Sequence, residues 1–371
     1  MKKYLLIICL LIVTWNTYAQ ENSGPISSDT TMVRFRRGRS SQDLMHLREI
    51  RKTGWFRYVP YGHSLYADVH PYMVRMDIAA LTNNDIYNFA SNEKNYRCYT
   101  EGLFGMQLPI WCGNFSNGQF GLSLTMALSA DLWLDIFEPQ TAPVVNTDYR
   151  IGAPSITFIH RINRGFAQNY SITWSPFKHE STHIGDEQQI RRMEAGYALR
   201  RVNVSYNYTE FQFTLNEPED RYSQCHTFRA NLMVLWNPKS GWYTVNEQAG
   251  DGDASYAHPR ISPWEANLQY QYQSPTSKQG WQGIISAEIR NRALYGYDLT
   301  ALNGTPESKP KQDSRCFTYN IFVGARYNIK GYDSYLSRVS FGIRAYHGNC
   351  PYGMFRSIDN FSQIGTCVIF Q

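Results

Sequence analysis

The sequence lacks long hydrophobic runs: after the first 20 of its 371 positions, none approaches the roughly 20 apolar residues that a transmembrane helix needs. Charged residues are also scarce, at 18%, whereas aromatic residues make up 15%. Because disordered chains are rich in charge and poor in aromatic side chains, this composition excludes disorder. The sequence therefore describes an ordered, tyrosine-rich chain whose mature part contains no membrane-spanning helix.

Motifs for cofactors and for several kinds of catalysis are missing as well. The chain has no glycine-rich phosphate loop, no H-E-x-x-H, no G-x-S-x-G and no C-x-x-C pair, so no cofactor or metal is predicted. Seven cysteines occur, six of them after position 20, and the sequence leaves open whether one or two disulfides form. Without the first 20 residues the chain has 34 basic and 31 acidic residues, a net charge of +3 that predicts no nucleic-acid partner.

The first 19 residues have the features of a secretory signal peptide. Lys2 and Lys3 follow the initial methionine, an apolar run extends from Leu5 to Val13, and Ala19 ends a small-x-small cleavage site. Residues 20–54 are polar and basic, with a short helix expected over Asp43–Arg51. We expect this segment to form a periplasmic tail or a plug that enters a lumen.

Strict alternation of apolar and polar residues dominates the chain from residue 55 onward. In the clearest run, Phe120–Phe137, the even positions from Leu122 to Ile136 are apolar and most odd positions are polar. This period predicts a β-strand with one apolar face. At roughly 3.3 Å per residue the run would span about 50 Å, far beyond the roughly 3 to 10 residues of most soluble strands. Its length favours a membrane-spanning strand over the alternative, a secreted β-sandwich or jelly roll.

Similar alternating runs recur at 266–272, 317–328, 339–346 and 364–370, with polar segments between them. Apolar-out, polar-in strands separated by turns are typical of outer-membrane barrels. We therefore predict an all-β fold, a transmembrane antiparallel up-and-down β-barrel of about 12 strands, over residues 55–371 in the bacterial outer membrane. Long extracellular loops are expected at 237–263 and 299–315. The expected partners are outer-membrane lipid, the barrel-assembly machinery and an envelope protein.

One run changes its parity. Its apolar positions are Val202, Val204, Tyr206 and Tyr208 and then become odd, at Phe211 and Phe213. A β-bulge near Thr209 would explain the switch, because one extra residue reverses the facing of everything beyond it.

Chemistry-bearing side chains concentrate in one segment, residues 178–187, which holds two histidines, a serine and three acids. His179 and Ser181 lie two residues apart and share one face of a strand, as a general base and a nucleophile require. Asp186 or Glu187 would orient the base. This H-x-S arrangement resembles that of outer-membrane phospholipase A and the lipid A deacylases, which implies lipid hydrolysis by a pair that points into lipid.

The preceding residues predict a different facing. Ile172 and Trp174 lie on the apolar face, so that continued alternation puts His179 and Ser181 in the lumen unless Pro176 introduces a bulge. This interpretation favours a lumenal polar network, formed by His179, Ser181, His183, Asp186, Glu187 and Arg191. A metal site is disfavoured, because strand geometry separates His179 from His183 by about 13 Å.

The segment H-E-S-T-H-I-G-D-E, residues 179–187, also resembles the H-x-S-S-H-x-G-D-E signature of an uncharacterised, Bacteroidetes-type outer-membrane family. Residues 346–356 are similar to that family's G-x-x-P-x-G-Q-F segment, with Met354 in place of the usual glutamine. The resemblance implies a signal peptide and a barrel, and it carries no established activity. We expect a non-enzymatic channel or a structural component of an envelope complex. The alternative is a lipid hydrolase that uses His179, Ser181 and Asp186.

Overall fold

The computed structural model describes most of the barrel wall and part of the segment before it. The described residues are 53–56, 61–81, 98–116, 118–135, 144–164, 166–184, 200–217, 224–236, 242–246, 264–293, 315–328, 338–352 and 361–370. The predicted signal peptide and the helix expected at Asp43–Arg51 lie outside them. No helix among the described residues is long and apolar enough to cross a membrane.

Fifteen strands are formed by the described residues. They are β1 (Gly54–Trp55), β2 (Val74–Leu81), β3 (Cys98–Phe115), β4 (Phe120–Leu134), β5 (Val144–Gly152), β6 (Ser155–Arg164), β7 (Ala167–Ile184), β8 (Arg200–Leu215), β9 (Cys225–Leu235), β10 (Trp242–Asn246), β11 (Trp264–Gln273), β12 (Trp281–Ala293), β13 (Arg315–Asn328), β14 (Arg338–Gly348) and β15 (Phe361–Phe370).

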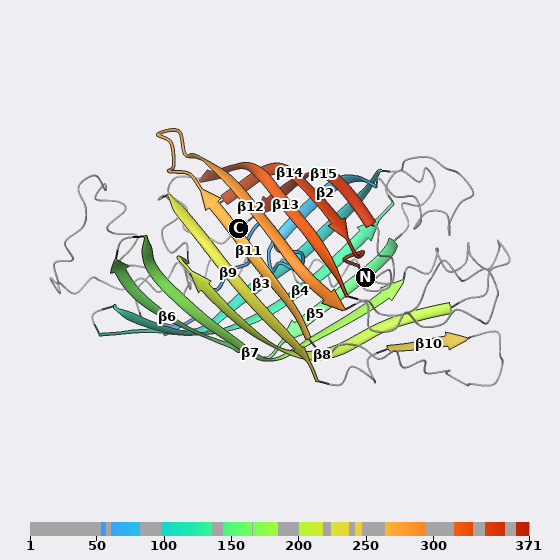
Figure 1. The fold of residues 1–371 in the computed structure, drawn as a ribbon, viewed down its shortest axis with the longest axis horizontal. Coiled ribbons are helices and arrows are strands. Elements are labelled where there is room, and N and C mark those ends of the chain that lie inside the picture. Colours follow the sequence, from blue (N-terminus) through green and yellow to red (C-terminus); the bar gives the residue numbers. More distant parts are fainter. Residues whose placement is uncertain are drawn as a thin grey trace.

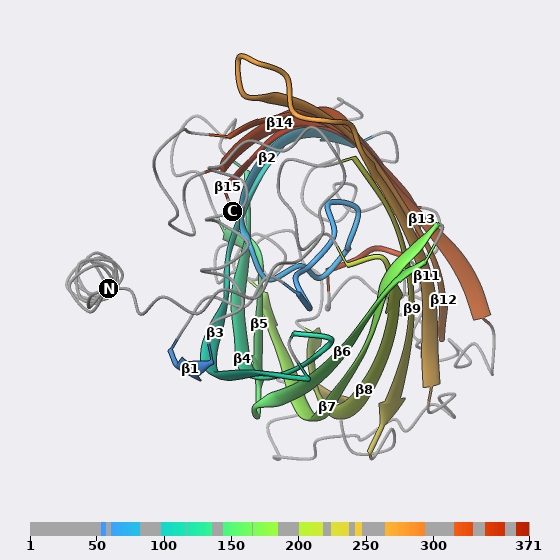
Figure 2. The same cartoon turned by 90° about the vertical axis from the view of Figure 1, so that its left-hand side faces the viewer.

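The strands form one closed antiparallel barrel (Figures 1 and 2). Each wall strand pairs with its neighbours in sequence, and β15 pairs with β2 to close the wall. Both β5 and β6 pair with β4 and β7, so they are two halves of one wall strand, while β1 and β10 add to the edges of β3 and β8. The wall therefore has 12 strands, which confirms the predicted up-and-down barrel. Strand β10 falls within the loop expected at 237–263, so that expectation was incomplete.

Side-chain facing follows the predicted alternation over most of the wall. In β4 the polar or small odd positions from Gly121 onward are mostly buried inside, and the even leucines are more exposed. Strands β11, β13, β14 and β15 show the same pattern, with Leu268 61% exposed and Ile343 56% exposed on the outside. Such an exposed apolar belt would be unfavourable in water and matches the lipid-facing surface of a transmembrane barrel.

Strand β8 departs from its predicted facing. Tyr206 and Tyr208 are 4% and 5% exposed and lie on the lumenal side, while Asn207 is exposed on the outside. The register between β8 and β9 runs without a shift from Tyr208 to Leu215, so the bulge predicted near Thr209 is wrong. The prediction failed because it assigned tyrosines to lipid, whereas these tyrosines line a polar interior.

A plug formed by residues 61–73 lies inside the barrel, ahead of β2 (Figure 2, blue). On one side, Gln107 of β3 donates to the Gly62 carbonyl at 2.9 Å. On the other side, Gln271 of β11 accepts from the Tyr66 amide at 3.1 Å, and Asn320 of β13 donates to the Ala67 carbonyl at 2.7 Å. The plug therefore bridges opposite walls of the lumen, and it belongs to the range 55–371 that the sequence assigned to the barrel.

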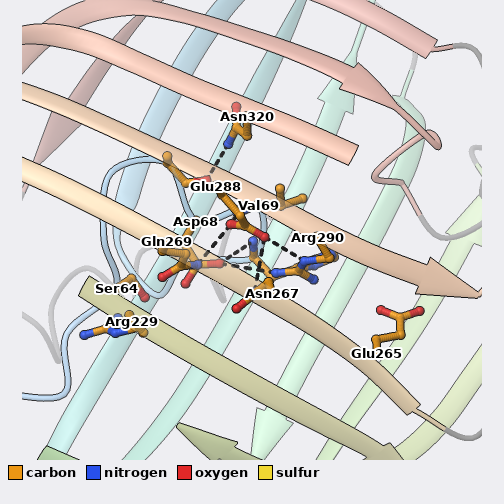
Figure 3. A network of polar contacts seen from close by, with 12 residues as sticks. Ser64, Asp68, Val69, Arg229, Glu265, Asn267, Gln269, Glu288, Arg290 and Asn320 are labelled. Atoms are coloured by element: carbon orange, nitrogen blue, oxygen red, sulfur yellow. Dashed lines mark hydrogen bonds and ion pairs between the residues drawn. The ribbon is translucent and has the colours of Figure 1, made fainter. Parts of the chain in front are cut away.

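Glu288 of β12 is the main anchor of the plug (Figure 3). Its carboxylate accepts the Val69 amide at 3.0 Å, the Gln269 amide group at 3.0 Å and the Arg290 guanidinium at 2.7 Å. Arg290 in turn lies 3.7 Å from Asp68 of the plug. A buried carboxylate with several donors is stable only while all of them stay in place, so the network holds the plug in one position.

A second lumenal network ties the first strands to the last. Arg75 of β2 contacts Asp77 at 2.9 Å and also pairs with Glu101 of β3. Arg344 of β14 reaches Asp77 at 2.9 Å and Glu101 at 3.2 Å. These ion pairs cross the seam where β15 meets β2, and they add side-chain bonds between strands that are far apart in sequence.

The segment after β14 also turns into the lumen. Gly348 has a φ of +128°, and a Cβ there would lie 2.7 Å from the Thr318 Cα, so the turn requires glycine. Tyr352 then stacks on Trp133, with ring centroids 4.5 Å apart, and donates to Glu101 at 2.9 Å. The described part of the 346–356 segment therefore helps to fill the interior.

The six cysteines after position 20 form no disulfide bond. All six cysteines after position 20 lie within the described residues and are thiols: Cys98, Cys112, Cys225, Cys316, Cys350 and Cys367. The barrel is held by its strand ladder and its lumenal polar networks.

A bridged lumen predicts a barrel that does not conduct ions steadily. The purified protein in planar bilayers should insert and show no continuous open-state current, because the plug spans the lumen between opposite walls. Folding is verified by gel electrophoresis, in which a folded barrel migrates differently before and after the sample is boiled. A continuous current of the size seen with porins, from protein whose folding is verified in this way, would contradict the closed lumen.

Candidate functional site

Two adjacent wall strands carry an irregularity at the same level. The wall strand β5–β6 is interrupted at Ala153 and Pro154, and the register between β7 and β8 shifts between Ser175 and Lys178. Each of these two strands has one residue more than the regular strand beside it, which is β4 for β5–β6 and β8 for β7. Between the pairs Ile151–Leu128 and Ser155–Thr125, the chain advances four residues along β5–β6 but only three along β4. Because side chains alternate with period two, one extra residue reverses the facing of all that follows.

Hydrogen bonds fix this double bulge in place. The Ala153 amide donates to the Phe177 carbonyl at 2.9 Å, which joins the two irregular strands. The Thr209 hydroxyl of β8 donates to the Pro176 carbonyl at 2.8 Å, and the Trp236 indole N–H donates to that hydroxyl at 2.5 Å. The Trp236 and Phe177 rings meet edge to face at 5.3 Å. Both backbone carbonyls at the bulge are therefore paired, as a position beside lipid requires.

The bulge turns the motif outward. Before it, Ser171, Thr173 and Ser175 are buried in the lumen, and after it the buried positions are Lys178, Glu180 and Thr182. His179, Ser181 and His183 are more exposed and share the outer face with Ile151, which is 53% exposed and pairs with His179. The lumenal facing predicted for these three residues is wrong. The physical reason is the Pro176 bulge, the exception that the sequence had left open.

The inner side of the same segment takes the charged residues. Lys178 pairs with Glu210 and lies 4.9 Å from the centre of the Tyr72 ring of the plug. Arg150 of β5 lies 3.6 Å from Glu180. A small polar cavity of about 50 Å³ in the lumen adjoins Lys178, Glu180 and Glu210. The bulge therefore places Lys178 and Glu180 toward the lumen and His179, Ser181 and His183 on the outer face.

His179 has a partner on the next strand. Asn207 is its direct Cα partner on β8, and the His179 Nδ1 lies 2.8 Å from the Asn207 Oδ1. An amide oxygen can only accept, so Nδ1 carries a proton, and in the neutral imidazole Nε2 then keeps the lone pair. The bond thus sets the imidazole tautomer that a general base needs. Sequence reasoning missed Asn207 because it assigned that position to the lumen.

Ser181 lies between two other neighbours on the outer face. Tyr149 of β5 and Ser205 of β8 are its Cα partners on either side. His183 follows two residues later, and its ring meets that of Tyr149 at 6.0 Å, edge to face. No hydrogen bond joins His179 to Ser181 among the described residues, and catalytic hydrogen bonds are often long before substrate binds.

The remaining predicted site residues cannot be placed. Asp186, Glu187 and Arg191 lie outside the described residues. Within the described ranges, no group of three or more histidine, cysteine or acidic side chains is arranged to hold a metal ion.

The fold and the outer apolar belt define the class of the protein, a transmembrane β-barrel of the outer-membrane type. The sequence matches no family model and no curated protein.

Several solved barrels are similar in shape. They include outer membrane phospholipase A from Escherichia coli (11% identity, 84% of this chain and 95% of that chain covered, TM-score 0.42), the translocator domain of autotransporter NalP from Neisseria meningitidis (9% identity, 80% and 86% covered, TM-score 0.35) and the CymD monoaromatic hydrocarbon channel (6% identity, 80% and 87% covered, TM-score 0.36). These proteins differ in function, so the site has to be interpreted from this chain's own side chains.

The bulge should depend on the Thr209 hydroxyl. Thr209→Val removes both the donor to Pro176 and the acceptor for Trp236, which should lower the free energy of unfolding by about 1–3 kcal/mol. Urea unfolding in lipid vesicles measures the change. The matched control is Thr366→Val, at a lipid-facing threonine of β15, which should leave stability unchanged or raise it. Equal effects of the two substitutions would contradict the role of Thr209.

Proposed function

We propose that this barrel is an outer-membrane ester hydrolase whose nucleophile is Ser181, whose general base is His179 and whose orienting group is Asn207. The observation that carries the proposal is the 2.8 Å bond between His179 and Asn207 on the lipid-facing side of the wall. It gives the His-x-Ser pair the third member that such sites need. The sequence analysis offered Asp186 or Glu187 for this role, and both lie outside the described residues.

An asparagine suits this location better than an aspartate would. The site lies on a surface that bilayer lipid covers, where an ionised carboxylate carries a large desolvation penalty and a neutral amide a smaller one. An Asn oxygen still accepts the Nδ1 proton and holds the ring. The chemistry can therefore operate beside lipid without a buried charge on its outer face.

The chemical steps follow from the tautomer. The Ser181 hydroxyl attacks the ester carbonyl while its proton moves to the His179 Nε2. The tetrahedral intermediate then collapses, the histidine returns that proton to the departing alcohol oxygen, and an acyl-serine remains. Water, deprotonated by the same imidazole, attacks the acyl-serine and releases the fatty acid with Ser181 restored.

The location of the site supports a lipid substrate. Ser181 lies near the C-terminal end of β7. At this end of the barrel the connections between strands are long, such as 185–199 after β7 and 82–97 after β2, whereas the turn 116–119 at the opposite end of the barrel is short. In such barrels the long loops face the cell exterior, so the site would lie in the outer half of the membrane. Molecules that reach this face from the bilayer are lipids, and the plugged lumen makes a channel the weaker candidate.

Ester hydrolysis by purified protein is the test. Wild-type protein in mixed micelles should release fatty acid from a glycerophospholipid, and a fluorophosphonate probe should label Ser181. Ser181→Ala should reduce hydrolysis by roughly 10³-fold or more and abolish labelling. Asn207→Ala should reduce it by roughly 10²-fold, because the base loses its tautomer and orientation.

The chain provides a matched control in a second His–Ser pair. His347 and Ser362 also lie on the outer face, and the His347 Nδ1 is 2.6 Å from the Ser362 Oγ. There the serine oxygen occupies the nitrogen that Asn207 holds at His179, so this pair lacks the orienting partner on Nδ1 that the proposal requires. Ser362→Ala should keep full activity. Hydrolysis that survives Ser181→Ala, or wild-type protein that neither hydrolyses nor labels, would refute the proposal.

A further inference from the structure

His183 is an outward-facing histidine that the proposed catalytic steps do not use. It lies on the same face as Ser181, two residues further along β7, which places their Cα atoms about 7 Å apart. Its side chain is exposed, and the edge-to-face contact with Tyr149 at 6.0 Å limits where the ring can go. An imidazole N–H is therefore held beside the nucleophile, on the side toward the end of the strand.

The surface on the opposite side of Ser181 is apolar. Beyond the bulge, the outward residues of β7 and β8 are Trp174, Ile172, Phe211 and Phe213, each between 43% and 48% exposed. The Trp174 and Phe211 rings stack nearly parallel, at 11°, with centroids 6.5 Å apart. This continuous aromatic and aliphatic surface leads from the site toward the middle of the wall and suits acyl chains.

A lipid bound across the site would therefore have a fixed direction. Its acyl chains would lie along Trp174 and Phe211, its ester carbonyl at Ser181, and its headgroup toward the end of β7. In a glycerophospholipid the phosphate is only a few covalent bonds from the ester carbonyl. That separation is comparable with the spacing between Ser181 and His183.

Resting on the hydrolase function proposed above, we infer that His183 binds the headgroup phosphate of the lipid substrate while Ser181 attacks an ester bond. The substrate class is then a phosphate-bearing acyl lipid rather than a neutral glyceride. An imidazole N–H donating to an anionic oxygen forms a charge-assisted hydrogen bond, which is stronger than a neutral one. His183 is thus a specificity-determining residue, and Tyr149 is the residue that positions it.

Two substrates with identical acyl chains separate this role from catalysis. His183→Ala should lower kcat/KM for phosphatidylglycerol about tenfold, mainly through KM, and leave diacylglycerol hydrolysis within about twofold of wild type. His347→Ala, at the outward histidine of β14, is the matched control and should change neither substrate. An equal loss on both substrates, or no loss on either, would overturn the assignment.

A binding measurement keeps this test separate from the proposed function. A non-hydrolysable diether phosphatidylglycerol should bind wild-type protein in micelles about tenfold more tightly than His183→Ala, and Ser181→Ala should bind it like wild type. If hydrolysis is absent and this difference remains, the hydrolase proposal fails and the phosphate site stands. If inorganic phosphate displaces the diether lipid as strongly as a second phospholipid does, the site is a simple anion site and the lipid assignment fails.

Discussion

The rest of this structure depends on one constraint, the alternation of side chains in a wall whose every backbone group must be paired. In a closed barrel between lipid and a polar interior, the register alone determines whether a side chain faces lipid or the lumen. One extra residue in each of the wall strands β5–β6 and β7, at the same level, therefore changes which side chains reach the outer surface. Without the bulge at Pro176, Lys178 and Glu180 would face lipid, and the His179–Ser181 pair would be enclosed in the lumen.

The interior supplies the stability that such an exception needs. Charged groups displaced inward by the bulge find partners there, as Lys178 does with Glu210 and Arg150 with Glu180. The plug anchored at Glu288 and the Arg75–Glu101–Arg344 network fill the lumen with paired charges. Lumen and outer face thus differ: paired charges on the inside brace the wall, and the outside carries His179, Ser181 and Asn207, the residues of the proposed site.

Most of the fold could be predicted from the sequence, because period two over many residues has few explanations once length is counted. The strands at 120–134, 317–328 and 339–346 face as their patterns indicate. The errors occurred where the pattern itself is broken. Tyr206 and Tyr208 carry a polar group on an apolar ring, so the sequence does not determine which side of the wall they face. A proline in a strand is compatible with a bulge but does not by itself predict one. Asn207 was missed for the same reason, since its importance depends on the facing of β8 and on its register with His179.

The outward facing of Ser181 is the central claim, and lipid crosslinking tests it most directly. A photo-crosslinking amino acid is introduced at position 181 or, in a separate protein, at position 180, and both are irradiated in vesicles of labelled phospholipid. The structure predicts strong lipid adducts from position 181 and few from position 180, where Glu180 is buried in the lumen. Adducts from position 180 and none from position 181 would show that β7 continues without a bulge and would contradict the site.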